Sequence, residues 1–134
     1  FYDDYAHHPT EINAVLSSVR QVYPKRKIIS VFQPHRYSRI KQLKNEFSLA
    51  FKQSDLVLLC PVYSAGEKTK YNFNQRKFSE QISSKSEVQV INIFDQSDLR
   101  NFLKKNLFKD EMVICMGAGS ISNWIRNISK EKWI

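Results

Sequence analysis

Short apolar runs alternate along the chain with longer stretches in which apolar residues recur every three or four positions. The short runs are rich in β-branched residues, a composition that is typical of buried strands. They lie at residues 1–3, 27–32, 56–60, 88–94 and 112–116. The pattern therefore predicts five strands, of which the first is very short.

The longer stretches predict five helices. Pro9 suits a first helical position, and the apolar spacing that follows predicts a helix over 9–22. A second helix is expected over 38–53, with the Ser38 hydroxyl as its cap. The other three are a weaker helix after a cap at Asn74, a helix after a cap at Ser97, and a helix with its apolar stripe over 121–128.

Strands that alternate with helices at this spacing predict an α/β, Rossmann-like fold, in which a mostly parallel sheet carries helices on both faces. Residues 1–134 are expected to form a single domain. In such folds ligands bind outside the carboxyl ends of the strands. Functional residues are therefore expected in the segments that follow strands, at 3–9, 33–39, 61–67, 94–96 and 117–120.

Composition limits the class of protein. Hydrophobic residues make up 42% and charged residues 25% of the chain, as in an ordinary globular domain. The longest apolar runs, at 56–60 and 112–116, are far shorter than the roughly 20 residues of a membrane-spanning helix, so no membrane partner is expected. Cys60 and Cys115 lie inside these runs and are expected as small buried hydrophobes, which fits a reducing cytoplasm.

The net charge of +8 favours an anionic partner. Nucleic acid, anionic lipid and a phosphorylated small molecule all meet that description, and charge does not choose among them. The lysines are scattered along the sequence without a basic block, which is typical of a solvated surface. Residues 1–4 contain neither an initiator methionine nor the start of a signal peptide, and we expect the chain to be part of a longer protein.

Two carboxylates and two imidazoles follow the first strand: Asp3, Asp4, His7 and His8. Tandem histidines point apart and lack the spacing of a helical zinc site, so no metal is expected there. A carboxylate after a strand accepts hydrogen bonds from ribose hydroxyls, and histidine donates to phosphate or carboxylate oxygens. A plain turn before a helix N-terminus explains the same residues equally well.

Two arginines lie at the expected start of the second helix. Arg36 and Arg39 are three positions apart, beside backbone N–H groups that a helix start leaves unbonded. This arrangement is suited to hold an anion. The alternative is a pair of exposed arginines without a ligand.

Two further segments follow strands. Residues 62–67 begin a loop of about 14 residues, a length that is found in functional loops, although a plain connection explains it equally well. Residues 116–120 read Met-Gly-Ala-Gly-Ser, and small residues at a strand-to-helix turn let the backbone approach a ligand. This turn lacks the third glycine of the dinucleotide fingerprint, and no phosphate-binding P-loop occurs in the chain.

Four segments together resemble the C-terminal domain of the Mur ligases, the enzymes of peptidoglycan assembly. They are D-D-Y-A-H-H-P-T-E at 3–11, F-Q-P-H-R-Y-S-R at 32–39, V-Y-S-A-G-E at 62–67 and M-G-A-G-S-I at 116–121. The likeness covers essentially the whole chain. Its most specific parts, at 3–9 and 35–39, look most like the branch of the family that joins L-alanine to UDP-N-acetylmuramate.

The resemblance implies a three-domain cytoplasmic enzyme of which this chain is the third domain. The N-terminal UDP-binding domain and the central domain, which would hold ATP and Mg²⁺, are absent from the chain. ATP would phosphorylate the muramoyl carboxylate, and the amine of L-alanine would attack the acyl phosphate, giving an amide, ADP and phosphate. Because the chain has no P-loop, we expect it to be inactive alone.

The resemblance also implies roles for individual residues. No residue is assigned as certainly catalytic, and no metal ligand is expected. Candidate stabilisers of the anionic intermediate are Arg36, Arg39 and His35. Candidate substrate-binding residues are His7, His8, Tyr37, Ser64 and Gly66. Candidate ATP-binding residues are Asp3, Asp4, Gly117, Ala118, Gly119 and Ser120.

Two other classes of protein remain open. A basic Rossmann-like module that binds nucleotide or nucleic acid without catalysis explains the charge. No basic stripe interleaved with aromatic residues runs along an expected element, however, so no specific nucleic acid is expected. The second alternative is a structural domain that only mediates assembly. Trp124 and Trp133 near the C-terminus would then be contact residues for a partner.

Overall fold

The computed structural model describes residues 1–107 and 110–130, and their backbone forms one five-stranded sheet. The strands are β1 (Tyr2–Asp4), β2 (Ile28–Phe32), β3 (Leu56–Leu59), β4 (Gln89–Asn92) and β5 (Met112–Met116). Their order across the sheet is β1-β5-β2-β3-β4, and every neighbouring pair is parallel. The predicted strands are confirmed, with ends that differ by two residues or fewer.

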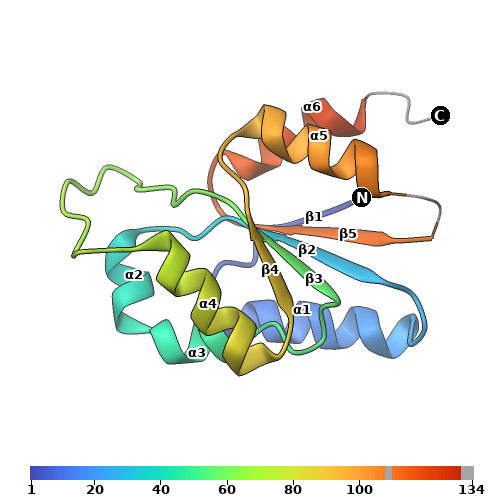
Figure 1. The fold of residues 1–134 in the computed structure, drawn as a ribbon, viewed down its shortest axis with the longest axis horizontal. Coiled ribbons are helices and arrows are strands. Elements are labelled where there is room, and N and C mark those ends of the chain that lie inside the picture. Colours follow the sequence, from blue (N-terminus) through green and yellow to red (C-terminus); the bar gives the residue numbers. More distant parts are fainter. Residues whose placement is uncertain (108–109, 131–134) are drawn as a thin grey trace.

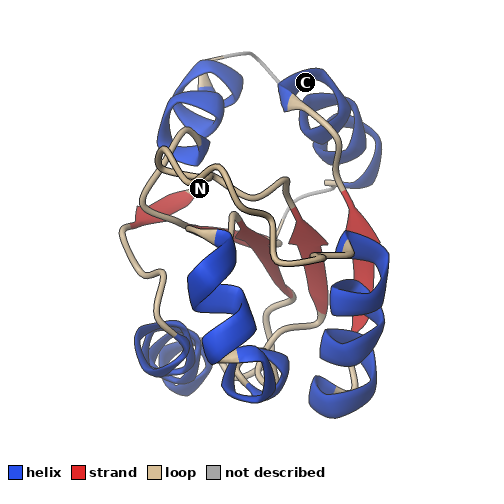
Figure 2. Ribbon diagram, turned by 90° about the vertical axis from the view of Figure 1, so that its left-hand side faces the viewer, coloured by secondary structure: helices blue, strands red, loops and turns tan. Residues whose placement is uncertain are grey.

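Helices cover both faces of the sheet (Figure 1). They are α1 (Pro9–Val22), α2 (Tyr37–Gln42), α3 (Lys44–Leu49), α4 (Gln75–Ser86), α5 (Gln96–Asn106) and α6 (Ile121–Ser129). Helices α1 to α4 pack on one face and α5 and α6 on the other, and Figure 2 shows these two layers on either side of the strands. The predicted α/β fold is confirmed.

The two faces form two separate hydrophobic cores because successive side chains of a strand point to opposite sides. In β2, Ile28 and Phe32 face the core beneath α1 to α4, whereas Ile29 and Val31 face the core beneath α5 and α6. All four side chains are at most 1% exposed. Burying side chains of this size contributes about 1.5–3 kcal/mol each, which explains why β2 reads as a continuous apolar run.

The expected helix over 38–53 is wrong as a single element. The backbone leaves helical geometry at Leu43, with φ −117° and ψ 27°, and the segment divides into α2 and α3. Both parts keep their apolar residues on the sheet, since Ile40 and Phe47 are buried. The break thus lets the chain bend over the sheet without exposing either side chain.

Helix caps agree with the sequence at one position and differ at two. The Asn74 side chain accepts a hydrogen bond from Lys77 N–H at the start of α4, as predicted. Helix α5 is capped by Asp95, which accepts from Asp98 N–H, so the expected Ser97 cap is wrong. Ser38 lies inside α2 rather than before it, and its hydroxyl donates to the Glu67 carboxylate, so the expected Ser38 cap is wrong as well.

Parallel pairing places the carboxyl ends of the strands along one edge of the sheet. Met116 at the end of β5 lies opposite Asp4 on one side and Phe32 on the other. The loop between β3 and α4 extends outward from the same edge (Figure 1). The segments that follow strands therefore meet here, as the topology predicts.

Three other expectations concern particular side chains and helix length. Cys60 and Cys115 are fully buried, as predicted, and burial raises the pKa of both thiols. Trp124 packs in part against the core beneath α5 and α6, whereas Trp133 lies outside the described residues. Within the described part of the chain, no helix is both long and apolar enough to span a membrane.

Candidate functional site

Asp4 ends β1, the outermost strand, and so lies at one end of this edge. Its Oδ1 accepts a hydrogen bond from Ala6 N–H at 2.8 Å, and Gly117 N–H donates to its carbonyl oxygen at 3.3 Å. Its other carboxylate oxygen, Oδ2, has no partner within residues 1–107 and 110–130. Asp3 accepts a hydrogen bond from the Ser122 hydroxyl of α6 instead, so the structure does not bring the two carboxylates together.

The two histidines after β1 have different surroundings. His8 is the N-cap of α1: its Nδ1 accepts from Thr10 N–H at 3.2 Å, while the Glu11 carboxylate accepts from His8 N–H at 3.0 Å. This reciprocal capping box gives His8 a structural role at the start of α1, and its substrate-binding role stays a prediction. The backbone hydrogen bond from His8 is also the main cause that lowers the pKa of Glu11.

His7 belongs instead to a row of four rings that crosses the edge. The ring of Tyr5 meets His7 edge-on with centroids 5.2 Å apart, and His7 lies 5.5 Å from His35. His35 in turn stacks on Tyr63 at 5.6 Å with an interplanar angle of 19°. The row joins the segment after β1 to the segments after β2 and β3.

His35 is held neutral by its environment. Burial is the largest cause that lowers its pKa, and the charges of His7, Arg36 and Arg39 act in the same direction. Its buried Nδ1 has no hydrogen-bond partner among the described residues. A neutral imidazole at this edge has one nitrogen that accepts a proton and one that donates a hydrogen bond.

Arg36 and Arg39 both lie beside His35, and neither has an ion-pair partner in the described part of the chain. Arg36 is exposed and has φ 69° and ψ 130°, a conformation that residues other than glycine rarely adopt. Such backbone costs about 1–3 kcal/mol and is commonly retained at functional sites. The two guanidiniums thus concentrate positive charge at this edge, an arrangement that is suited to hold an anion.

The backbone N–H groups of α2 contribute less to this site than the sequence predicts. Helix α2 has only six residues, and the N–H of Ser38 donates to Glu67 Oε1 at 3.2 Å. The Ser38 hydroxyl donates to the other oxygen of the same carboxylate. Ser38 therefore offers neither its N–H nor its hydroxyl to an anion.

Glu67 reaches Ser38 from a tight turn in the loop after β3. Glu67 N–H donates to Ser64 carbonyl oxygen at 3.0 Å, and the two central residues, Ala65 and Gly66, have φ values of 53° and 88°. The candidate residues Ser64 and Gly66 therefore shape the turn that presents Glu67. Arg36 N–H also donates to Tyr63 carbonyl oxygen at 2.8 Å, which ties this loop to the arginine segment.

The turn at 117–120 packs closely against the same two segments. A Cβ atom at Gly119 would lie 2.4 Å from the Tyr63 ring, and one at Gly117 would lie 3.2 Å from the carbonyl oxygen of Gln33. The buried Gln33 amide donates to Ser120 Oγ at 2.9 Å and accepts from Ile121 N–H at 3.0 Å. Close packing of the turn explains why its residues are small.

The structure brings most predicted residues together and separates a few. Asp4, His7, His35 and the residues of the 117–120 turn, including Ala118, meet at the edge beside Arg36 and Arg39. Tyr37 turns away from this edge and packs against Phe73 at 5.5 Å. Among the described residues, no group of three histidine, cysteine, aspartate or glutamate side chains is arranged to hold a metal ion.

Three residues that support the site are missing from the predicted set: Gln33, Tyr63 and Glu67. Each lies inside a segment that sequence analysis selects, but its partner is far away along the chain. The polar Gln33 directly after an apolar strand is the one signal that the sequence offers for them.

Comparison with known proteins identifies the family. The family model described as "Mur ligase, glutamate ligase domain" matches residues 1–119. The chain belongs to the Mur ligase family. This Mur ligase domain is 51% identical over 128 residues to UDP-N-acetylmuramate–L-alanine ligase of Pelagibacter ubique, and 41% identical over 129 residues to the enzyme of the same name from Fusobacterium nucleatum.

The chain spans only part of these relatives. Each alignment covers 96% of this Mur ligase domain but 28% and 26% of the respective relatives. Among solved structures, UDP-N-acetylmuramate-alanine ligase from Thermotoga maritima matches with a TM-score of 0.73 at 24% identity, over 95% of this chain and 25% of that one. A murein peptide ligase from Psychrobacter arcticus matches with a TM-score of 0.76 at 14% identity, over 95% and 26%. These two structures support the fold.

Proposed function

We propose that this chain is the C-terminal domain of an ATP-dependent ligase that joins L-alanine to UDP-N-acetylmuramate in peptidoglycan precursor synthesis. The observation that carries the proposal is that Arg36 and Arg39, which have no ion-pair partner among the described residues, lie beside His35 at the carboxyl edge of the sheet. The relatives that bear the name of this activity align over nearly the whole chain. The other two domains of the enzyme are then the partners of this edge.

In this function Arg36 and Arg39 stabilise negative charge as the muramoyl carboxylate becomes an acyl phosphate and reacts. The transition state spreads charge over phosphoryl and carbonyl oxygens, so preorganised cations lower its energy more than a protein nucleophile would. Because neither arginine is paired within the described residues, domain closure brings their charges to the substrate without first breaking an ion pair.

The histidines and Asp4 have complementary tasks. L-alanine attacks the acyl carbon as the neutral amine, after its ammonium group has lost one proton to solvent. The His35 ring, next to His7, accepts the second proton from the nitrogen as the amide forms, and phosphate leaves with the electrons of the acyl–oxygen bond. The free oxygen of Asp4 accepts a hydrogen bond from a ribose hydroxyl of ATP, beside the 117–120 turn. When the domains close, this edge excludes water that would hydrolyse the acyl phosphate.

The described residues do not fit a Mg²⁺ site, because they offer no cluster of three acidic or histidine ligands. We therefore assign Mg²⁺ and the ATP phosphates to the central domain of the enzyme. On this assignment the chain alone releases no phosphate from ATP, with or without UDP-N-acetylmuramate and L-alanine.

Replacing Arg36 in the full-length enzyme tests the proposal. We expect Arg36→Ala to lower kcat/KM about 100-fold or more in an assay of phosphate release, since a charged transition-state donor is lost. The melting temperature should stay unchanged, because Arg36 is exposed. Arg126→Ala, which removes an exposed arginine from α6, is the matched control and should retain wild-type turnover. Full activity of Arg36→Ala would refute the proposed role.

A further inference from the structure

A cavity lies beside α2, and none of the four rings of the row lines it. It has a volume of about 390 Å³ and is formed by α2, the start of α3, the end of the loop that precedes α4, and the first turn of α4. Buried Ile40 and Phe78 form its apolar floor, and Tyr37 packs on Phe73 at its side. Small-molecule sites in proteins typically have volumes of about 300–1,000 Å³, so the cavity is large enough for a ligand.

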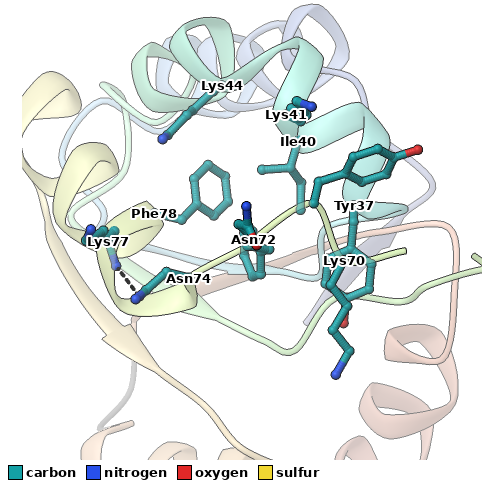
Figure 3. A pocket seen from close by; sticks show the side chains of 11 residues that line it. Tyr37, Ile40, Lys41, Lys44, Lys70, Asn72, Asn74, Lys77 and Phe78 are labelled. Carbon is teal, nitrogen blue, oxygen red and sulfur yellow. Dashed lines mark hydrogen bonds between the residues drawn. The ribbon is translucent and has the colours of Figure 1, made fainter. Parts of the chain in front are cut away.

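Four lysines line this cavity, one each from α2, α3, the loop before α4 and α4: Lys41, Lys44, Lys70 and Lys77. Figure 3 shows Lys41, Lys44 and Lys77 around the floor, and Lys70 on the far side with its ammonium group pointing outward. The lining contains no aspartate or glutamate, and none of the four lysines forms an ion pair within the described part of the chain. The cavity thus gathers positive charge that this chain does not neutralise.

An aromatic ring is held at the rim beside these charges. Tyr71 is 43% exposed, and the ammonium nitrogen of Lys41 lies 4.9 Å from its ring centroid. Tyr71 and Asn72 have φ values of 49° and 56°, so two successive residues of this loop have left-handed backbone conformation where the ring is attached. Such backbone is costly in residues other than glycine and is commonly found at ligand-binding positions.

We propose that this cavity binds a nucleoside diphosphate or triphosphate, with the lysines on the phosphates and the base against the aromatic rim. Several ammonium groups around one hollow match a ligand with several phosphate charges, and an aromatic ring offers a stacking surface to any base. The site is distinct from the edge described above, because Asp4, His7, His35, Arg36 and Arg39 are not among its lining residues. It does not depend on the proposed ligase function.

Titration calorimetry of the chain with ADP and with pyrophosphate tests the site. We expect saturable one-to-one binding of both near physiological salt, with ADP the tighter ligand because its base contributes stacking. The variant Lys41→Gln/Lys44→Gln should weaken both affinities about tenfold or more, since charge-assisted contacts are lost. Lys25→Gln/Lys104→Gln removes the same net charge from exposed positions elsewhere and should change them less than about twofold. Thermal melting checks that both double variants stay folded.

Three results would overturn the proposal. The first is equal weakening in the two double variants, which would mean that only net charge attracts the anion. The second is loss of ADP binding in Arg36→Ala with no loss in Lys41→Gln/Lys44→Gln, which would place the anion at the edge and leave the proposed ligase function intact. The third is binding of an acidic peptide or an oligonucleotide without binding of ADP, which would make the cavity part of a macromolecular interface.

Discussion

The carboxylate of Glu67 binds Ser38 twice, through the backbone N–H and through the hydroxyl, and so fixes the start of α2 from a loop that follows another strand. Arg36 lies two residues before this contact and Arg39 one residue after it. Glu67 therefore holds the backbone between the two candidate arginines in place.

This contact should appear in the pH dependence of stability. The hydrogen bond from the Ser38 side chain is the largest cause that lowers the pKa of Glu67 below its ordinary value of 4.5. A carboxyl group whose pKa is lower in the folded state adds stability that is present above the unfolded pKa and is lost as the pH falls through the folded pKa. We expect the free energy of unfolding of the wild type to fall more steeply below about pH 4.5 than that of Glu67→Gln.

Denaturant unfolding between about pH 3 and 7 measures this difference. Glu46→Gln, at an exposed position on α3, is the control and should follow the wild-type curve. Parallel curves for wild type and Glu67→Gln over the whole range would show that the contact with Ser38 contributes no pH-dependent stability.

The backbone at Arg36 predicts opposite effects of one substitution on stability and activity. Glycine adopts φ 69° without strain, whereas alanine at this position keeps the backbone strain. The variant Arg36→Gly should therefore be about 1 kcal/mol more stable than Arg36→Ala. Both variants lack the guanidinium and should be equally impaired in the full-length enzyme. Chemical denaturation of the pair measures the difference, and equal stabilities would show that the backbone at this position relaxes.

The contact between Gly119 and Tyr63 predicts a coupled pair. A methyl group at position 119 would lie 2.4 Å from the Tyr63 ring, so Gly119→Ala should cost about 1–3 kcal/mol of stability through overpacking. In a Tyr63→Ala background the same change should cost much less, which a double-mutant cycle measures. Gly66→Ala is the control. It should lower stability through backbone strain at φ 88°, because a Cβ atom at position 66 would meet no neighbouring atom, and Tyr63→Ala should not relieve that strain.

His35 should titrate below the ordinary histidine range. Burial is the largest cause that lowers its pKa, and the stacked Tyr63 ring provides part of that burial. An NMR titration of the imidazole resonances should show a pKa below 6.5 for His35, and a higher value in Tyr63→Ala, in which water reaches the ring. A value that Tyr63→Ala leaves unchanged would assign the lowered pKa to the neighbouring charges instead.

The fold was largely predictable because its strands are buried on both faces. Continuous apolar runs such as Ile28–Phe32 and Met112–Met116 are hard to place outside the centre of a parallel sheet. The break at Leu43 was not predictable, since the apolar spacing through 38–53 fits one helix as well as two. Helix starts were predictable where the capping side chain binds only its own helix. Asn74 caps α4 in this way, whereas the Ser38 hydroxyl donates to Glu67, a residue that is distant in the sequence.

The site was predictable to the extent that topology decides it. A parallel sheet brings Asp4, Arg36 and Gly117 to one edge whatever the intervening loops do. Contacts between loops follow no such rule. Gln33 binds Ser120 and Glu67 binds Ser38, and no local sequence pattern predicts either partner. The lysine cavity shows the same limit, because lysines scattered in the sequence become neighbours only when α2, α3 and α4 come together.

The position of β5 between β1 and β2 has a consequence for the order of folding. Strands β2, β3 and β4 pair in sequence order, so their half of the sheet can form while the polypeptide is still being synthesised. Strand β1, by contrast, pairs among the described residues with β5 alone, which is the fifth of these strands along the chain. Closing the long loop between β1 and β5 costs conformational entropy and is slow. We therefore expect the contact between Asp4 and Gly117 to form late, after the part of the edge that carries Arg36 and Arg39.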